Sequence, residues 1–283
     1  MAVNPSQCNG YARTIWVEIV RAASVCQNER VIPAFSYAAT GSRVCRCYRT
    51  VRQFEADELK LPRLLHRWNV SPKQAVAIQR KFARRVIPIG KAPRLHLAAG
   101  ADCAFSSDRE ECIAAVVVWD VAARQVVEQI VVRRAVRFPY VPGLLTFREA
   151  PAILAAIRKL RCEPDVFFFD GQGYAHPRRF GLACHLGVLM DRPSLGCAKS
   201  ILIGEADAPG VRCGSTAPLV HNGEQIGSAV RTRDGVKPVY VSVGHRLSLA
   251  AAVGIVLACG AGFRLPEPTR RADILVGHAR TVR

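Results

Sequence analysis

Two aspartates stand where the neighbouring residues predict apolar side chains. Asp102 interrupts the mostly apolar run 95–105, and Asp170 directly follows the apolar run 166–169. A carboxylate beside such runs must be paired, protonated or bound to a cation to offset its desolvation. If the two runs are neighbouring strands, they bring together two hard oxygen ligands of the kind that Mg²⁺ prefers. Taken singly, each residue could instead be a strand-end aspartate that caps the following loop.

A glycine-rich segment, residues 170–179 with the sequence DGQGYAHPRR, begins at the second aspartate. Gly171 and Gly173 permit close backbone approach, and Arg178 and Arg179 flank the start of the next predicted helix. A helix N-terminus beside two guanidinium groups can accept an anion such as phosphate. The segment lacks the GxGxxG and GK[ST] patterns, which argues against a dinucleotide or P-loop site. The alternative is a tight strand–helix loop with solvated arginines.

Three further polar residues stand near the ends of predicted elements. Lys199 and His245 each follow a predicted strand, and Glu149 lies early in a predicted helix, near its positive end. Each of them alone would be interpreted as a surface or capping residue. The acids, the glycine loop, the lysine and the histidine nevertheless all follow strands, and the sites of open α/β sheets collect at such ends.

The elements that must position these residues form a mixed pattern. We predict strands over residues 95–105, 113–119, 126–132, 166–169, 194–198, 226–231 and 239–243. We predict helices over residues 72–86, 144–160, 179–189 and 248–259, the first with Ser71 as N-cap and Gln74 in a capping box. Strands first, followed by alternating helices and strands, indicate an α/β fold with a mixed sheet and helices packed on its faces.

The charge balance favours a polyanionic partner. Forty Lys and Arg against 22 Asp and Glu give a net charge of +18 and a pI near 10.0. Each phosphate that a basic protein neutralises releases a condensed counterion, so nucleic acid fits this excess. An Arg-rich codon bias is the alternative explanation. With 283 residues, 50% of them hydrophobic, the chain can form one domain with an appendage or two small domains.

The eleven cysteines do not indicate a disulfide framework, because their number is odd and their spacing is scattered. The N-terminus has no charged region followed by an unbroken apolar stretch, as a secretory signal would. No run approaches the ~18 apolar residues that a membrane span needs. We therefore expect reduced thiols, a cytoplasmic location and no membrane association.

The sequence changes character near residue 60. Residues 1–58 show weak periodicity apart from one amphipathic stretch over 11–25. Cys26, Cys45 and Cys47 could bind zinc, but the paired C-x₂-C spacing of structural zinc sites is missing. We expect residues 1–58 to be a poorly structured or non-native N-terminal extension, as a mis-assigned start codon would give, and residues 59–283 to form the functional domain.

Six blocks of sequence, in one fixed order, resemble the endonuclease V (deoxyinosine 3′ endonuclease) family. They are GAD at 100–102, FPYVPGLLTFRE at 138–149, DGQGYAHPR at 170–178, GCAK at 196–199, GHRLS at 244–248 and LPEPTRRAD at 265–273. Six ordered blocks are far more specific than any single motif. The resemblance covers roughly residues 65–275, and residues 1–58 match nothing in the family.

The resemblance implies a ribonuclease H-like fold, with a mixed β-sheet and helices on both faces. It implies an Mg²⁺-dependent endonuclease, in which Mn²⁺ can substitute, that cuts the second phosphodiester bond 3′ to hypoxanthine. On matching positions, Asp102 and Asp170 would be metal carboxylates and Glu149 the third, directly or through water. Lys199 would neutralise charge on the scissile phosphate, and His245 would lie at the far side of the site, touching phosphate or positioning water.

The resemblance also implies a substrate-binding set. Tyr140 belongs to the loop that would wedge into the gap left by a flipped base. The remaining members would line or flank the pocket for that base: Gly143, Leu145, Gly171, His176 and Arg178. Backbone groups around Gly171 could distinguish hypoxanthine from adenine at its O6/N1–H edge.

The chain departs from the family pattern at one position, and two alternative functions remain open. The family often carries an acidic residue two positions after the Ser of GHRxS, where this chain has Ala250, and Asp273 could supply an acid instead. The chain could be a ribonuclease H-like nuclease that favours inosine in RNA or branched DNA. It could also bind deaminated bases without cutting, although three converging carboxylates in a basic protein argue against that. We expect a monomer whose partner is nucleic acid.

Overall fold

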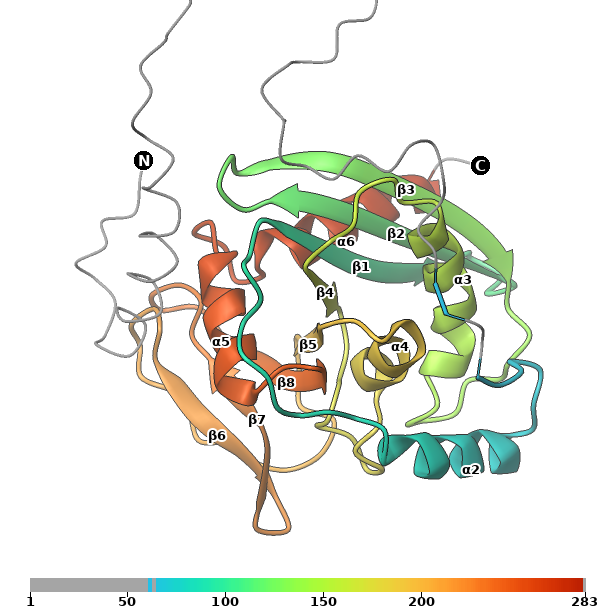
Figure 1. Ribbon diagram of the computed structural model, residues 1–283, viewed down its shortest axis with the longest axis horizontal. Helices are drawn as coiled ribbons and strands as arrows, with labels where there is room; N and C mark the ends of the chain where they lie inside the picture. The colour runs from blue at the N-terminus through green and yellow to red at the C-terminus, as the bar shows by residue number, and fades with distance from the viewer. Residues whose placement is uncertain (1–60, 63–64, 282–283) are drawn as a thin grey trace, which may run out of the picture.

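One mixed β-sheet forms the centre of the protein (Figure 1). The computed structural model describes residues 61–62 and 65–281, and the predictions for residues 1–58 lie outside them. Eight strands of the described residues are hydrogen-bonded side by side in one sheet. In spatial order they are β3 (Gln125–Ala135), β2 (Glu111–Asp120), β1 (Leu97–Phe105), β4 (Val166–Phe169), β5 (Ser194–Ala198), β8 (Val239–His245), β7 (Glu224–Val230) and β6 (Thr216–His221).

The strand directions decide which strand ends lie together. β1, β2 and β3 form the expected antiparallel meander. β4 and β5 are both parallel to β1, so the carboxyl ends of these three strands share one edge of the sheet. β8 is antiparallel to β5, so its carboxyl end lies at the opposite edge. Residues that follow β8 therefore lie at the edge opposite to those that follow β1, β4 and β5, although all of them follow strands in the sequence.

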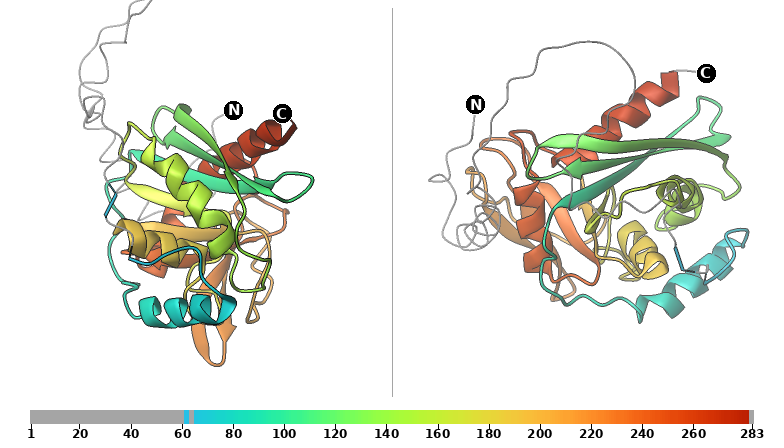
Figure 2. Two further views of the ribbon diagram at one scale, coloured as in Figure 1. Left: turned by 90° about the vertical axis from the view of Figure 1, so that its right-hand side faces the viewer. Right: turned by 45° about the horizontal axis from the view of Figure 1, so that its top comes forward.

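Helices cover both faces of the sheet, as predicted (Figure 2). The five helices of the described residues are α2 (Pro72–Ala83), α3 (Thr146–Arg158), α4 (Leu182–Met190), α5 (Leu249–Ala258) and α6 (Glu267–Thr281). Ala101 and Phe169 belong to the core beneath α3 and α4. Ala98 and Phe168 belong to the core on the other face, beneath α5. Because side chains alternate along a strand, each buried strand contributes to both cores.

The predicted start of α2 is confirmed. The backbone N–H of Gln74 donates to Ser71 Oγ at 3.3 Å, and that of Ser71 donates to Gln74 Oε1 at 2.8 Å. The helix ends at Ala83, and Arg84 is its C-cap, three residues before the predicted end. A capping box satisfies two backbone donors that the first turn otherwise leaves unpaired.

Two elements have no counterpart in the sequence-based prediction. β6 is an edge strand that contains Pro218, and proline weakens a strand pattern because it cannot donate to a ladder. α6 buries only a narrow stripe of side chains, which includes Ala272 and Val276. The helical spacing of its apolar residues is therefore weak in the sequence. Within the described residues, no helix is long and apolar enough to cross a membrane.

An aromatic cluster fastens the segment before α2 to α4. His66 Nε2 lies 2.7 Å from Nε2 of His185, and the ring centroids of Trp68 and Phe147 each lie 5.4 Å from that of His185. Phe180 contacts the same ring at 4.7 Å. Burial, aided by the nearby His66 and His176, lowers the pKa of His185 well below its ordinary value, so this imidazole is neutral in the folded protein.

The buried His185 should make the protein less stable in acid. In the unfolded chain the pKa of this imidazole is higher, near 6.5. The stability that the neutral His185 allows above pH 6.5 is therefore lost as the pH falls below that value. For one such group the free energy of unfolding falls by on the order of 1 kcal/mol between pH 7.5 and pH 5.5. We expect His185→Leu to remove about that much of the pH dependence in urea unfolding. The exposed His278→Leu is the matched control, and equal pH dependence in wild type and His185→Leu would contradict this prediction.

Candidate active site

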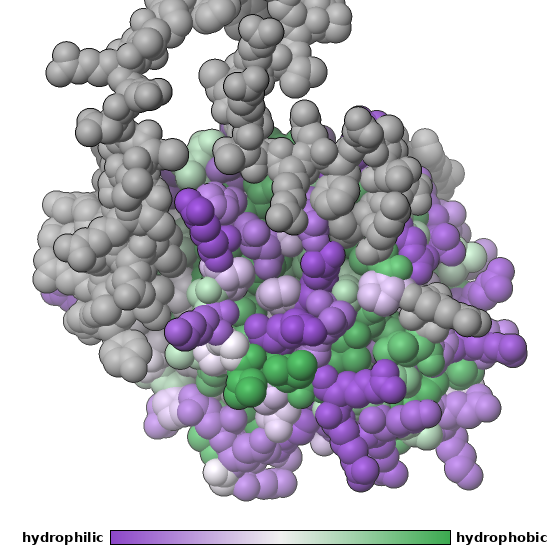
Figure 3. Space-filling view, in the orientation of Figure 1, coloured by the Kyte–Doolittle hydropathy of each residue, from purple (hydrophilic) through white to green (hydrophobic). Residues whose placement is uncertain are grey.

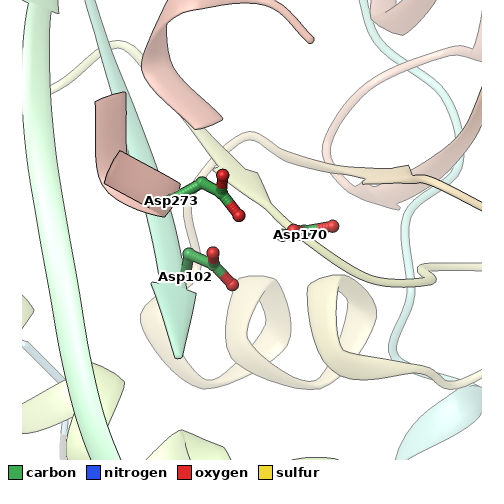
Figure 4. Close-up of side chains that lie close together, drawn as sticks. All are labelled: Asp102, Asp170 and Asp273. Carbon is green, nitrogen blue, oxygen red and sulfur yellow. The ribbon is translucent and has the colours of Figure 1, made fainter. Parts of the chain in front are cut away.

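Three aspartates from three different elements converge at the shared strand edge (Figure 4). One carboxylate oxygen each of Asp102, Asp170 and Asp273 lie within 4.8 Å of one another. Ala101 of β1 pairs with Phe169 of β4, so the residues that follow them lie side by side. The sequence-based expectation that Asp102 and Asp170 lie on neighbouring strands is therefore confirmed.

A close backbone contact brings the third aspartate to this edge. A Cβ atom on Gly100 would lie 2.1 Å from the backbone carbon and oxygen of Pro268, closer than any side chain permits. Glycine at this position therefore lets the start of α6 lie directly against β1. Glu267, buried at the start of α6, receives hydrogen bonds at 2.7 Å from Arg270 and from Arg271. These contacts fix the turn of α6 that carries Asp273.

Burial and mutual repulsion oppose the ionisation of the clustered carboxylates. Burial, followed by repulsion from Asp170, raises the pKa of Asp102 to about 7. Burial also raises the pKa of Asp170, although Lys199 opposes the rise. Lys199 Nζ lies 2.7 Å from Asp170 Oδ2 and 2.8 Å from Asp273 Oδ1. Burial lowers the pKa of Lys199, but its two hydrogen bonds outweigh that effect and raise the pKa overall, so its ammonium group stays charged.

Glu149 approaches the cluster from the other face of the sheet. It lies in the first turn of α3 and is 8% exposed. Burial raises its pKa well above the ordinary range, and the charges of Cys112, Asp102 and Asp170 add to the rise. Glu149 is not a member of the three-carboxylate group, in which Asp273 stands instead. Its position beside Asp102 and Asp170 is compatible with a contact to a shared cation, directly or through water.

The donor set fits a hard divalent cation. The three clustered side chains offer carboxylate oxygens, and none offers sulfur or imidazole nitrogen. Mg²⁺ binds through a few carboxylates and retains water, whereas zinc sites use thiolates and imidazoles. A cation among these oxygens would also reverse the repulsion that raises the pKa of Asp102.

The structure places His245 away from the carboxylates. His245 pairs with Ser194 at one end of β5, whereas Lys199 follows Ala198 at the other end, five residues and about 17 Å along the strand at 3.3 Å per residue. The His245 ring is 3% exposed, with Nε2 3.2 Å from Asp191 Oδ1 and Nδ1 accepting the Ile87 N–H at 3.2 Å. It fastens the C-cap of α4 to the segment before β1, at the edge opposite the carboxylates.

A pocket of about 390 Å³ opens beside the carboxylates. Asp170 and Lys199 form part of its wall. Five of the six residues predicted to bind substrate line it as well: Tyr140, Gly143, Leu145, Gly171 and His176. Arg178, the sixth, is not part of the lining, because its guanidinium group donates to the Gly143 carbonyl and to Gln79 behind the pocket wall. The site therefore joins a cluster of acids to a cavity large enough for a small ligand.

His176 is a neutral hydrogen-bond donor in this wall. Burial lowers its pKa to about 4, opposed by its bond to Gly143. Its Nε2 lies 2.9 Å from the Gly143 carbonyl, which can only accept, so Nε2 carries the proton. Its Nδ1 then accepts the backbone N–H of Arg178 at 3.2 Å. One tautomer satisfies both contacts.

Known proteins share this sequence and this fold. The Endonuclease V family model matches residues 80–274. The endonuclease V of Roseiflexus castenholzii is 50% identical over 219 residues, which are 77% of this chain and 97% of that protein. The crystal structure of the endonuclease V from Streptomyces avermitilis is 45% identical, with a TM-score of 0.72 over 76% of this chain and 95% of that one.

The chain belongs to the endonuclease V family. It is therefore an endonuclease with the ribonuclease H-like fold that the sequence resemblance implied. A further relative, the Ciona intestinalis endonuclease V carrying D234N, was crystallised with a 23mer DNA containing an inosine followed by a ribo-adenosine. It is 26% identical, with a TM-score of 0.66, and covers 75% of this chain and 99% of that one.

The structural placement of His245 predicts a variant that separates stability from cleavage. We expect His245→Leu to lower the free energy of unfolding by about 1–3 kcal/mol, because the Ile87 N–H loses its partner and Asp191 keeps only Arg246. Cleavage by the folded variant should stay within about threefold of wild type. Denaturant unfolding measures the change in stability, and a cleavage assay at matched concentration of folded protein measures the change in rate. A loss of about 100-fold in cleavage would instead indicate that His245 acts in the active site.

Proposed function

We propose that this endonuclease is an Mg²⁺-dependent DNA-repair enzyme. It recognises hypoxanthine, the base of inosine, and hydrolyses the second phosphodiester bond 3′ to it. The observation that carries the proposal is a carboxylate cluster and a pocket that share Asp170 and Lys199 as walls. A base held in the pocket places the backbone on its 3′ side next to the acids. The inosine-containing DNA bound by the Ciona relative supports the same substrate class.

In this proposal Asp102 and Asp170 bind the cation, and Asp273 completes the group on the α6 side. Glu149 acts from the α3 side, directly or through water. When bound, Mg²⁺, or Mn²⁺ in its place, offsets the charge that builds on the phosphate oxygens and orients water for attack. The carboxylates must be ionised to hold it, and the cation itself makes ionisation favourable.

Lys199 then faces the scissile phosphate. In the structure its ammonium group bridges Asp170 and Asp273 and lines the pocket. A cation among these carboxylates would weaken their hold on the ammonium group. Lys199 can then donate to a phosphate oxygen, where a fixed positive charge stabilises the transition state.

The pocket wall supplies recognition of the base. Tyr140 is 70% exposed on a loop between Pro139 and Pro142, so its ring is free to replace a base in the stack. Unstacking costs a few kcal/mol, least for a poorly paired base such as hypoxanthine. Gly143, Leu145, Gly171 and His176 then surround the flipped base, and Arg178 supports them through Gly143.

Exposed cations beside the pocket suit the phosphate backbone. On the face shown in Figure 3, hydrophilic side chains gather over the edge where α2 lies. Arg80, Lys81, Arg84 and Arg85 are exposed at the end of α2, and Arg80 is near enough to Arg178 to lower the pKa of its guanidinium group further than burial alone. A positively charged surface raises the association rate with nucleic acid and makes binding salt-dependent.

Cleavage of matched oligonucleotides tests this function. We expect strands that carry deoxyinosine to be cut in Mg²⁺ and left intact in EDTA, with the adenine control cut far more slowly. Asp102→Asn should lose about 10³-fold in rate, since a catalytic metal supplies several kcal/mol. Product length on a sequencing gel locates the cut bond.

The alternatives give different outcomes in the same assay. Equal cutting of adenine and deoxyinosine strands would overturn the specificity, and retained cutting by Asp102→Asn would overturn the metal site. Faster cutting of inosine in RNA than in DNA would favour the RNA-directed alternative. Tight binding of deoxyinosine without product would identify a non-cleaving binder. A monomeric state stays a prediction for light scattering.

The exposed ring of Tyr140 predicts a selective loss. Tyr140→Ala should lower kcat/KM on deoxyinosine in a duplex by about tenfold or more, because base–aromatic stacking contributes roughly 1–3 kcal/mol. On single-stranded deoxyinosine the loss should be smaller, because less stacking has to be replaced. Tyr140→Phe, which keeps the ring, is the control, and equal losses for Phe and Ala would contradict a stacking role.

A further inference from the structure

A glutamine occupies a core position of α2. Ala75, Gln79 and Phe82 are the buried residues of this helix, at positions i, i+4 and i+7. Gln79 is 0% exposed. A buried amide costs free energy unless it is hydrogen-bonded, so an apolar residue would suit a position that only packs.

The Gln79 amide joins two segments of the pocket wall. Its Nε2 donates to the carbonyl of Gly143 at 3.0 Å and to the carbonyl of Phe180 at 3.2 Å. Its Oε1 accepts from Nε of Arg178 at 2.6 Å. Gly143 lines one side of the pocket, and Phe180 is followed by Gly181, which lines another. One side chain therefore fixes the spacing between the two.

Three donors converge on the carbonyl of Gly143. Besides Gln79, the Arg178 guanidinium donates at 2.7 Å and His176 Nε2 at 2.9 Å. Gly143 has a φ of +76°, and a Cβ there would lie 2.8 Å from the Arg178 guanidinium. The loop therefore holds a backbone conformation that glycine alone adopts easily.

We infer that Gln79 is a positioning residue for base selection. It does not itself line the pocket, and its hydrogen bonds go to the backbone and side chain behind the pocket wall rather than to the carboxylates. It holds residues 140–145 against residues 171–181, so that the pocket and Tyr140 keep one geometry. The inference rests on the proposed function for its substrate, but the hydrogen bonds that it invokes exist without substrate.

The test compares two glutamines on one helix. Gln79→Met keeps the length of the side chain and removes all three hydrogen bonds. Gln74→Met is the matched control, because Gln74 lies in the exposed capping box of the same helix, where its side chain bonds to Ser71. Both changes lower the stability of α2, whereas only Gln79→Met releases the pocket wall.

We expect Gln79→Met to lower the ratio of deoxyinosine to adenine cleavage at least about tenfold and to leave the Mg²⁺ concentration for half-maximal rate unchanged. In hydrogen exchange without substrate, peptides covering 138–147 and 171–181 should exchange faster in Gln79→Met and remain as in wild type in Gln74→Met. Arg178→Met, which removes two bonds of the same network at a half-buried position, should change both measurements in the same direction and serves if Gln79→Met fails to fold.

Unchanged exchange in both loops, or equal effects of the two glutamine variants, would overturn the inference. Wild-type protein that does not prefer deoxyinosine would overturn the proposed function instead. In that case the exchange measurement still decides whether Gln79 holds the two loops together.

Discussion

Carboxylates buried at the ends of two parallel strands are the constraint on which this structure depends. Asp102 and Asp170 lie beside each other because β1 and β4 run in the same direction, and burial opposes their ionisation. The fold offsets part of that cost with the ammonium group of Lys199, which follows the end of β5. A divalent cation among the same carboxylates would favour their ionisation. The strain at this edge is therefore compatible with catalysis rather than a defect of packing.

The two faces of the sheet contribute different parts of the site. Asp102 and Asp273 meet on the side of α6, and Glu149 comes from α3 on the opposite side. A strand turns successive side chains to opposite faces, so a single strand end can collect acids from both layers. The pocket is built separately, from loops tied together by the carbonyl of Gly143. In the proposed function, catalysis and base recognition therefore depend on different structural elements, which meet at Asp170 and Lys199.

The sequence predicted the features that depend on local pattern. The strand 166–169 and the strand 194–198 were found at their observed bounds, because short apolar runs flanked by polar residues are distinctive. Asp102 and Asp170 were found because a charge in an apolar strand requires an explanation. Asp273 was offered only as a substitute acid, since its place depends on the contact between Gly100 and Pro268, which no periodicity reveals. His245 lies at the opposite edge of the sheet, because β8 is antiparallel to β5. The sequence pattern shows that His245 follows a strand, but it does not show the direction of that strand. Gln79 does have a signal in the sequence, because it is a polar residue on the apolar stripe of α2.

The contact between Gly100 and the start of α6 has a consequence for how the protein matures. The carboxylate cluster draws on β1 near the beginning of the described chain and on α6 at its end. Because synthesis runs from the N-terminus, the segments that carry Asp102 and Asp170 are made before α6. Asp273 joins them only when α6 docks on Gly100, so the three-carboxylate cluster is complete only once this helix is in place. A partly made nuclease would thereby lack its full set of acids for as long as its fold is incomplete.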